Sequence, residues 1–121
     1  MSAVDLLDKF AAAWNAHDVD ALLECMTEDG IFYGSAGPEP DGATYQGQEA
    51  LRTSYAALWQ MFPDAAWNDV NHFVDGDRAV TEWRFTGTKA DGSKVNVRGV
   101  DVFTLRDGKI HIKDTFRKQA L

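Results

Sequence analysis

Two aspartates near the end of the chain have the type and spacing that could support acid–base chemistry. In the segment 94–105, the alternate positions that carry mostly apolar side chains include one carboxylate, Asp101. In the segment 110–116, the apolar positions again include one carboxylate, Asp114. Because alternate side chains of a strand share a face, both aspartates are expected on the inward face of a sheet.

The turn between these two segments predicts that the aspartates meet. A two-residue Asp-Gly turn at 107–108 sets a register in which Asp101 lies directly opposite Asp114, with Cβ atoms ~4.5–5.5 Å apart. Burial and like charge would raise the pKa of at least one member of such a pair. A protonated carboxylic acid can donate to an oxyanion or act as a general acid. We therefore predict Asp101 and Asp114 as catalytic residues.

Simpler interpretations of the two aspartates stay open. Either side chain could reach solvent at a fraying strand end. Either could accept a hydrogen bond from a tyrosine, tryptophan or arginine, and a slipped register would separate the two.

Aromatic residues supply the material for a ligand pocket, since such pockets are largely apolar. The residues predicted to contact a substrate are Trp14, Phe32, Trp59, His72, Trp83 and Phe103. In the strand 78–86, the apolar parity favours an inward Trp83, whereas a two-residue turn at 91–92 would place Glu82 opposite Asp101. We follow the apolar pattern, and a bulge would reconcile the two.

The elements that must position these residues follow from periodicity. Apolar residues at helical spacing predict three helices, over about 3–14, 18–26 and 48–62. A short strand at 31–33 and a long loop at 34–47 separate the second helix from the third. After Pro63 the period changes to two, which predicts four strands at 67–74, 78–86, 94–105 and 110–116. This order predicts an α+β fold in which the helices pack on one face of a strongly curved, mostly antiparallel sheet.

The composition of the chain excludes several classes of partner and of binding site. The 121 residues suit one domain, 1–121, and the formal net charge of −7 disfavours nucleic acid and anionic membranes as partners. The single cysteine, Cys25, allows neither an internal disulfide nor a cysteine zinc site. No metal-ligand spacing or nucleotide-binding motif is present, so we expect neither metal nor cofactor. The absence of an apolar leader or membrane span predicts a cytoplasmic protein.

Several stretches resemble a known family: AAAWNAHDVDALLECMTEDGIF, YQGQEALR, MFPD, VDGDRAVTEWRFTGT and RGVDVFTLRDGKI. In order and spacing they resemble the nuclear transport factor 2-like superfamily, in particular its SnoaL-like branch, which is related to polyketide cyclases and ketosteroid isomerase. The resemblance implies a cone-shaped fold with a pocket between the helices and the concave sheet, and often a homodimer. The resemblance covers nearly the whole chain. The superfamily includes enzymes, ligand binders and assembly domains, so the fold does not fix the function.

Individual positions match the relatives unevenly. Asp101 matches the oxyanion donor in the Asp-x-Phe motif of ketosteroid isomerase and is the closest match to the acid/base aspartate of SnoaL-like cyclases. Phe10 and Gly34 stand where the isomerase has a tyrosine and its general base, which argues against steroid isomerisation. Asp114 matches one aspartate of the limonene epoxide hydrolase triad, but Trp83 and another aromatic residue replace the other two members.

Together these observations predict a small-molecule enzyme of cyclase or isomerase type that acts on an apolar carbonyl compound. In this hypothesis Asp101 is the acid/base or oxyanion donor and Asp114 tunes its pKa. One alternative is a non-catalytic binding module for a hydrophobic metabolite. The other is a dimeric assembly domain in which side chains fill the pocket.

Overall fold

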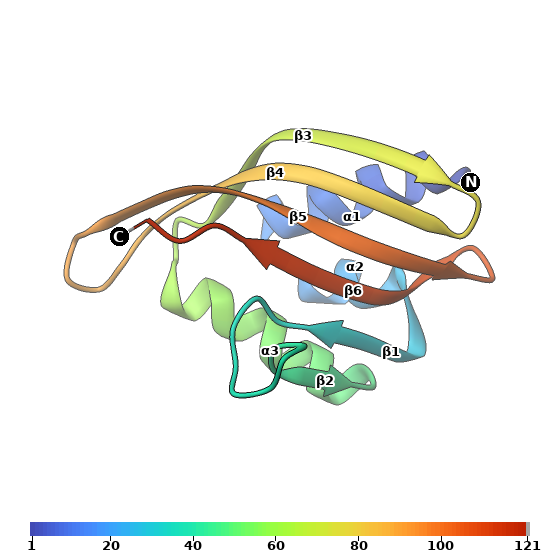
Figure 1. Ribbon diagram of the computed structural model, residues 1–121, viewed down its shortest axis with the longest axis horizontal. Coiled ribbons are helices and arrows are strands. Elements are labelled where there is room, and N and C mark those ends of the chain that lie inside the picture. Colours follow the sequence, from blue (N-terminus) through green and yellow to red (C-terminus); the bar gives the residue numbers. More distant parts are fainter. Residues whose placement is uncertain (121) are drawn as a thin grey trace.

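The computed structural model describes residues 1–120 and contains three helices and one six-stranded sheet (Figure 1). The helices are α1 (Ala3–Ala16), α2 (Val19–Glu24) and α3 (Gln48–Met61). The strands are β1 (Met26–Tyr33), β2 (Thr44–Gln46), β3 (Ala66–Asp75), β4 (Arg78–Thr88), β5 (Lys94–Arg106) and β6 (Lys109–Arg117). They lie in the order β2-β1-β6-β5-β4-β3, and only β1 and β6 run parallel.

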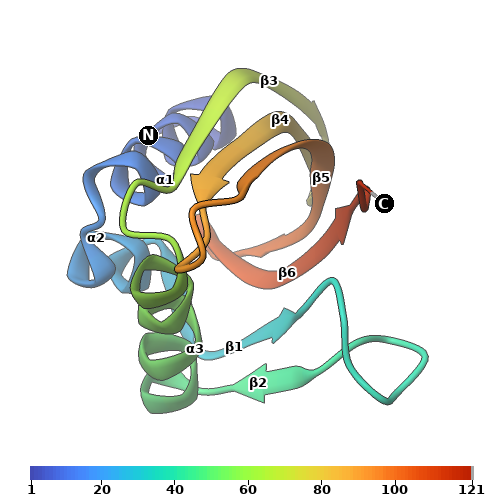
Figure 2. The ribbon, with the colours of Figure 1, turned by 90° about the vertical axis from the view of Figure 1, so that its left-hand side faces the viewer.

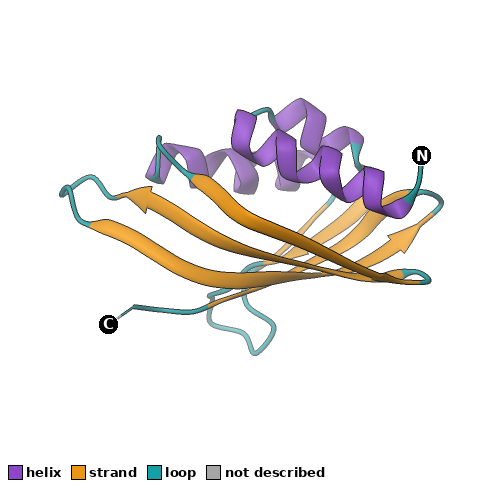
Figure 3. Cartoon of the chain, turned by 90° about the horizontal axis from the view of Figure 1, so that it is seen from above, coloured by secondary structure: helices purple, strands orange, loops and turns teal. Residues whose placement is uncertain are grey.

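The helices cover one face of a curved sheet (Figures 2 and 3). Figure 2 shows β3 to β6 curling around the helical layer, with α1 beside β3 and α3 beside β1 and β2. The loop between β1 and β2 lies on the opposite side of the sheet from the helices (Figure 3). This arrangement confirms the predicted α+β cone.

Local signals in the sequence explain where the helices begin and end. Ser2 and Asp5 form a reciprocal capping box at the start of α1. The Asp18 side chain accepts from the Ala21 amide at the start of α2. Between these two helices, His17 adopts a left-handed conformation and its Nε2 lies 2.8 Å from the Ala65 carbonyl oxygen, which joins the helical layer to the start of β3.

The segment after α2 differs from the sequence prediction. We expected the second helix to reach Met26, yet α2 ends at Glu24 and β1 begins at Met26. Met26 pairs with Ile110 of β6 and its sulfur accepts a hydrogen bond from Tyr55. These contacts between distant parts of the chain override the local helical pattern. Strand β2, which falls in the predicted loop, is three residues long and too short to show an alternating pattern.

The register of β4 against β5 confirms the inward Trp83. Trp83 pairs with Gly99, and Thr81, two residues earlier on β4, pairs with Asp101. The side chains of Thr81, Trp83 and Asp101 therefore share the buried face of the sheet. The connection between β4 and β5 is longer than two residues, since the amide of Lys89 donates to the Ser93 carbonyl and three residues lie between them. A two-residue turn would have placed Glu82 on the inward face. No bulge is required.

The register of β5 against β6 overturns the predicted pairing of the two aspartates. Near the turn the strands pair as expected, but His111 is an extra residue on β6, and beyond it the register moves by one. Asp101 therefore pairs with Thr115, and Asp114 pairs with Val102. A shift of one residue exchanges the two faces of a strand. The expectation that Asp101 lies opposite Asp114 is wrong for this reason.

Candidate functional site

A cavity of about 220 Å³ lies between α1, α3 and the concave face of the sheet. Aromatic and aliphatic side chains make up most of its wall: Trp14, Phe32, Tyr55, Leu58, Trp67, Trp83 and Phe85. The charged and hydroxyl-bearing side chains on the same wall come mainly from β5 and β6: Asp101, Lys113, Thr115 and Arg117. Side chains therefore do not fill the cone completely. The alternative of an assembly domain predicted a filled pocket.

Asp101 is the centre of a buried polar network, which we call the cavity cluster: Trp83, Asp101, Lys113 and Thr115. Its Oδ2 accepts from Trp83 Nε1 at 3.0 Å, and its Oδ1 accepts from Thr115 Oγ1 at 2.7 Å. Lys113 Nζ lies 3.1 Å from the same Oδ1. Asp101 is only 6% exposed. Three donors aimed at one carboxylate complement a negative charge, so this geometry suits an ionised acceptor.

Lys113 is the member of the cavity cluster that sequence reasoning missed. It is 5% exposed, and its ammonium also donates to Thr115 Oγ1 at 2.7 Å. The Nζ lies 4.5 Å from the ring centroid of Phe32 and 5.2 Å from that of Trp14, within range of a cation–π contact. The apolar parity of β6 pointed to the neighbouring Asp114, and nothing in the residue pattern marks the bulge that reverses this parity.

Asp114 lies away from Asp101, on the outer face of the sheet. It lines a groove of about 750 Å³ that also includes Pro40 and Asp41 of the loop between β1 and β2. Burial raises the pKa of Asp114, and the neighbouring Asp41 raises it further, ahead of the contribution from Asp101. The structure thus does not bring the two predicted catalytic aspartates together.

The predicted substrate contacts divide into two groups. Trp14, Phe32 and Trp83 line the cavity. Phe103 does not, because it is 1% exposed within the main core, and Trp59 packs its ring behind the cavity wall, 5.4 Å from that of Trp14.

His72, the remaining predicted contact, lies outside the cavity. Its Nδ1 is 2.8 Å from Thr81 Oγ1 and its Nε2 is 2.9 Å from Asp8 Oδ1. The imidazole therefore joins β3 to β4 and α1.

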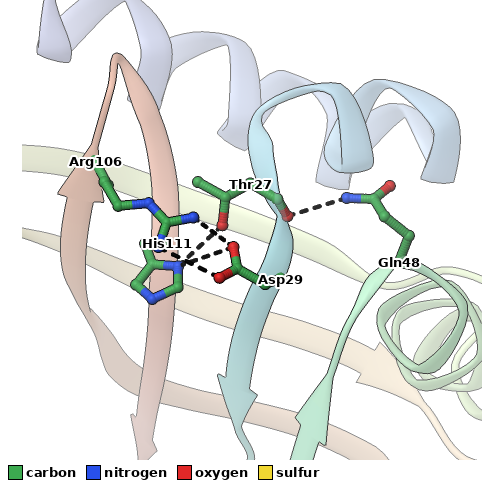
Figure 4. Close-up of polar contacts among 5 residues, drawn as sticks. All are labelled: Thr27, Asp29, Gln48, Arg106 and His111. Carbon is green, nitrogen blue, oxygen red and sulfur yellow. Dashed lines mark hydrogen bonds and ion pairs between the residues drawn. The ribbon is translucent and has the colours of Figure 1, made fainter.

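A second polar network joins β1 to β6, β5 and α3, and we call it the strand-end cluster: Thr27, Asp29, Gln48, Arg106 and His111 (Figure 4). Thr27 Oγ1 lies 2.9 Å from His111 Nδ1, and Gln48 donates to the Thr27 carbonyl at 3.2 Å. Asp29 pairs with Arg106 and lies 3.8 Å from His111 Nδ1. The side chain of His111 is only 18% exposed. These contacts occur where the pairing of β1 with β6 is irregular.

The described residues include neither a metal-binding group of side chains nor a membrane-spanning helix. Within residues 1–120, no group of three or more histidine, cysteine, aspartate or glutamate side chains is arranged to hold a metal ion. None of the helices in this range is long and apolar enough to cross a membrane.

Comparison with known proteins identifies the family. The model of the SnoaL-like domain matches residues 7–111. A candidate SnoaL-like polyketide cyclase from Jannaschia sp. CCS1 has 25% identity and a TM-score of 0.83, with 95% of this chain and 84% of that chain covered. An NTF2-like protein of unknown function from Mesorhizobium loti has 31% identity and a TM-score of 0.77, with coverage of 96% and 90%. A candidate polyketide cyclase from Xanthomonas campestris pv. campestris has 21% identity and a TM-score of 0.84, with coverage of 94% and 88%. No curated protein shows a significant match. The chain therefore belongs to the SnoaL-like domain family.

Proposed function

We propose that the chain is a small-molecule enzyme that performs acid–base chemistry of isomerase or cyclase type on a carbonyl compound. The observation that carries this proposal is the buried contact of Asp101 with Lys113, 3.1 Å apart, on the wall of an aromatic cavity. The similarity to candidate polyketide cyclases supports the same class of reaction.

The two charged groups would have complementary roles. A lysine ammonium has three N–H donors, and contacts to Asp101 and Thr115 account for two of them. The third would donate to the carbonyl oxygen of the substrate and stabilise the oxyanion of an enolate. Asp101 would accept the proton lost from the carbon next to that carbonyl. Returning the proton at another position completes an isomerisation, and attack of the enolate on a second carbonyl closes a ring.

This proposal changes the roles predicted from the sequence. Asp101 acts as the base rather than as a protonated donor, since Trp83 and Thr115 already donate to it. Lys113 takes the part of oxyanion donor. Asp114 has no place in the reaction because it faces the groove on the other side of the sheet.

A non-catalytic binding module is the second candidate, and one observation favours it. Both oxygens of Asp101 already accept hydrogen bonds from the protein itself. A carboxylate satisfied in this way can serve to hold Lys113 in place for a ligand oxygen. Binding of the ligand would then not depend on proton transfer.

Exchange of carbon-bound hydrogen separates the two candidates. Protein is mixed in D2O with 4-oxocyclohexanecarboxylate, a small ketone, and loss of its α-proton signals is followed by NMR. The wild type is expected to accelerate exchange, and Asp101→Asn is expected to lose about 100-fold or more of that acceleration, the usual contribution of a general base. Asp29→Asn, which removes an exposed carboxylate of the strand-end cluster, is the matched control and keeps the wild-type rate.

A second variant distinguishes loss of the general base from misfolding as the cause of lost exchange. In the double variant Asp101→Asn with Lys113→Met, both members of the buried pair are replaced by uncharged side chains, and the unfolding midpoint reports that the fold persists. Exchange that continues at the wild-type rate in this folded variant contradicts the enzyme. Binding of the ketone by Asp101→Asn within about tenfold of wild type, with no exchange by either protein, favours the binding module.

The predicted homodimer stays a prediction. The outer face of the sheet offers apolar surface for it, with Phe73 58% exposed and Phe116 55% exposed. Sedimentation equilibrium of the wild type against Phe116→Ser tests this face. A monomeric wild type contradicts the homodimer.

A further inference from the structure

Arg117 is a cation at the cavity for which the described residues supply no counter-ion. It lies on the same parity of β6 as Lys113 and Thr115, and it lines both the cavity and the groove outside it. None of the ion pairs formed within residues 1–120 involves it. Its guanidinium carbon lies 5.2 Å from the ring centroid of Phe85.

The surroundings of Arg117 make an incoming anion favourable. Burial lowers the pKa of the Arg117 guanidinium, because its charge is partly removed from water. A desolvated guanidinium gains from a planar anion, since its fork of N–H donors matches a carboxylate with two parallel hydrogen bonds.

The charges on the cavity wall leave an excess of one positive charge. Asp101 and Lys113 compensate each other at 3.1 Å. Tyr55 is neutral, because its hydroxyl donates to the Met26 sulfur and burial raises its pKa well above the ordinary value. Arg117 is the remaining charged group on this wall. This local excess of positive charge on the cavity wall favours an anionic ligand.

The size of the cavity limits the ligand to about one ring. Its volume of about 220 Å³ is below the roughly 300–1,000 Å³ of pockets for drug-sized molecules. It exceeds the ~150 Å³ of an apolar cavity that binds benzene. Along an extended strand, the Cα atoms of Lys113 and Arg117 are about 13 Å apart. Two side chains that reach inward from these positions can contact opposite ends of one ring.

We propose that Arg117 binds an ionised carboxylate of the substrate at the mouth of the cavity, so that the substrate is a small single-ring oxo acid. The carboxylate pairs with Arg117, the ring lies among the aromatic side chains, and the oxo group reaches Lys113. The oxo part of this inference rests on the proposed function. The anion site does not.

Binding of a matched pair of probes tests the site. The probes are 4-oxocyclohexanecarboxylate and its neutral carboxamide, and binding is measured through the fluorescence of the tryptophans on the cavity wall. The wild type is expected to bind the carboxylate at least about tenfold more tightly than the carboxamide. In Arg117→Met this preference disappears, and in Arg117→Lys, which keeps the charge without the fork, it is intermediate. Lys118→Met, which removes the exposed neighbouring cation, keeps the full preference.

Three results would overturn the anion site. These are equal affinity of the wild type for both probes, no binding of either probe at millimolar concentration, and equal loss of preference in Arg117→Met and Lys118→Met. Unfolding midpoints of the variants show that each is folded at the temperature of the assay.

The same probes separate this proposal from the proposed function. In Asp101→Asn the preference for the carboxylate should persist, because the anion site lies at the other end of the ring. A retained preference without proton exchange by the wild type contradicts only the enzyme. Proton exchange without any preference contradicts only the anion site.

Discussion

The cavity cluster and the strand-end cluster use similar groups and differ in their access to water. In the cavity cluster the side chains of Lys113 and Asp101 are 7% and 9% exposed. In the strand-end cluster the side chains of Arg106 and Asp29 are 45% and 57% exposed. Breaking a buried pair leaves an uncompensated charge in a medium of low polarity, whereas an exposed pair is screened by water. Similar contacts therefore contribute different amounts to the free energy of unfolding in the two places.

The two clusters are nevertheless connected through β6. His111 belongs to the strand-end cluster and is also the extra residue that shifts the register of β6 against β5. This shift turns Lys113, and not Asp114, toward the cavity. The exposed cluster thus holds the bulge that selects which charge Asp101 meets.

Insertion of one alanine after His111 has the largest expected effect, because it moves every later residue of β6 by one position against β5. With the bulge at His111 kept, Asp101 then pairs with Asp114, which places two carboxylates together and turns Lys113 outward. We expect the midpoint of urea unfolding to fall further than in any single substitution described here. An insertion variant as stable as wild type, with the Lys113 side chain still buried, contradicts the role of the bulge.

Lys113→Met is expected to have the second largest effect on stability, since it leaves the buried Asp101 without its cation. Breaking a buried pair costs about 3–5 kcal/mol of unfolding free energy. The double variant with Asp101→Asn should recover much of this loss, because neither member of the pair is then left as an unpaired charge. Urea unfolding of the two single variants and the double variant gives the coupling energy, and additive losses would show that the two charges do not interact.

Gly99→Ala tests how closely Trp83 packs in the cavity cluster. A Cβ atom at Gly99 would overlap the Trp83 ring and lie 2.7 Å from the Phe116 carbonyl oxygen. Overpacking of this kind costs about 1–3 kcal/mol. We expect a lower unfolding midpoint and altered tryptophan fluorescence, as the indole leaves Asp101. Gly34→Ala, where the nearest atoms are 3.6 Å away, is the control and should change neither.

Asp29→Asn has the smallest expected effect on stability at neutral pH, because water already solvates this carboxylate. Its hydrogen bonds with Arg106 lower the pKa of Asp29 below the ordinary value of 3.8. The stabilisation is therefore present above that value and is lost as the pH falls through the folded pKa. Unfolding midpoints of wild type and variant should converge in acid, and a gap that widens there contradicts the assignment.

Much of the fold follows from patterns within single segments. The capping box at Ser2, the stop at Pro63 and the alternation in β3 to β6 are local, so residue order was enough to place these elements. The start of β1 was missed because Met26 is held by partners far along the chain. The type of an element is thus more predictable than its boundary when packing decides the boundary.

The candidate site was predicted in part, for a related reason. Asp101 stood out because a carboxylate on an apolar stripe is costly unless it has partners, and Trp83 lies on the inward face where the pattern put it. Lys113 was missed because one bulged residue reverses the parity of everything that follows it on the strand. The bulged residue His111 contacts Thr27, which is far away in the sequence, and no pattern within β6 could reveal this contact.

The central claim is that ligands bind beside the cavity cluster and not elsewhere on the chain. A ¹H–¹⁵N NMR titration with 4-oxocyclohexanecarboxylate tests it most directly. We predict the largest shifts at the Trp83 indole N–H and the backbone amides of Lys113 and Thr115, with the amides of Thr27 and Asp29 unchanged. Shifts confined to the strand-end cluster or to the outer groove, or no shifts at millimolar ligand, would contradict the account.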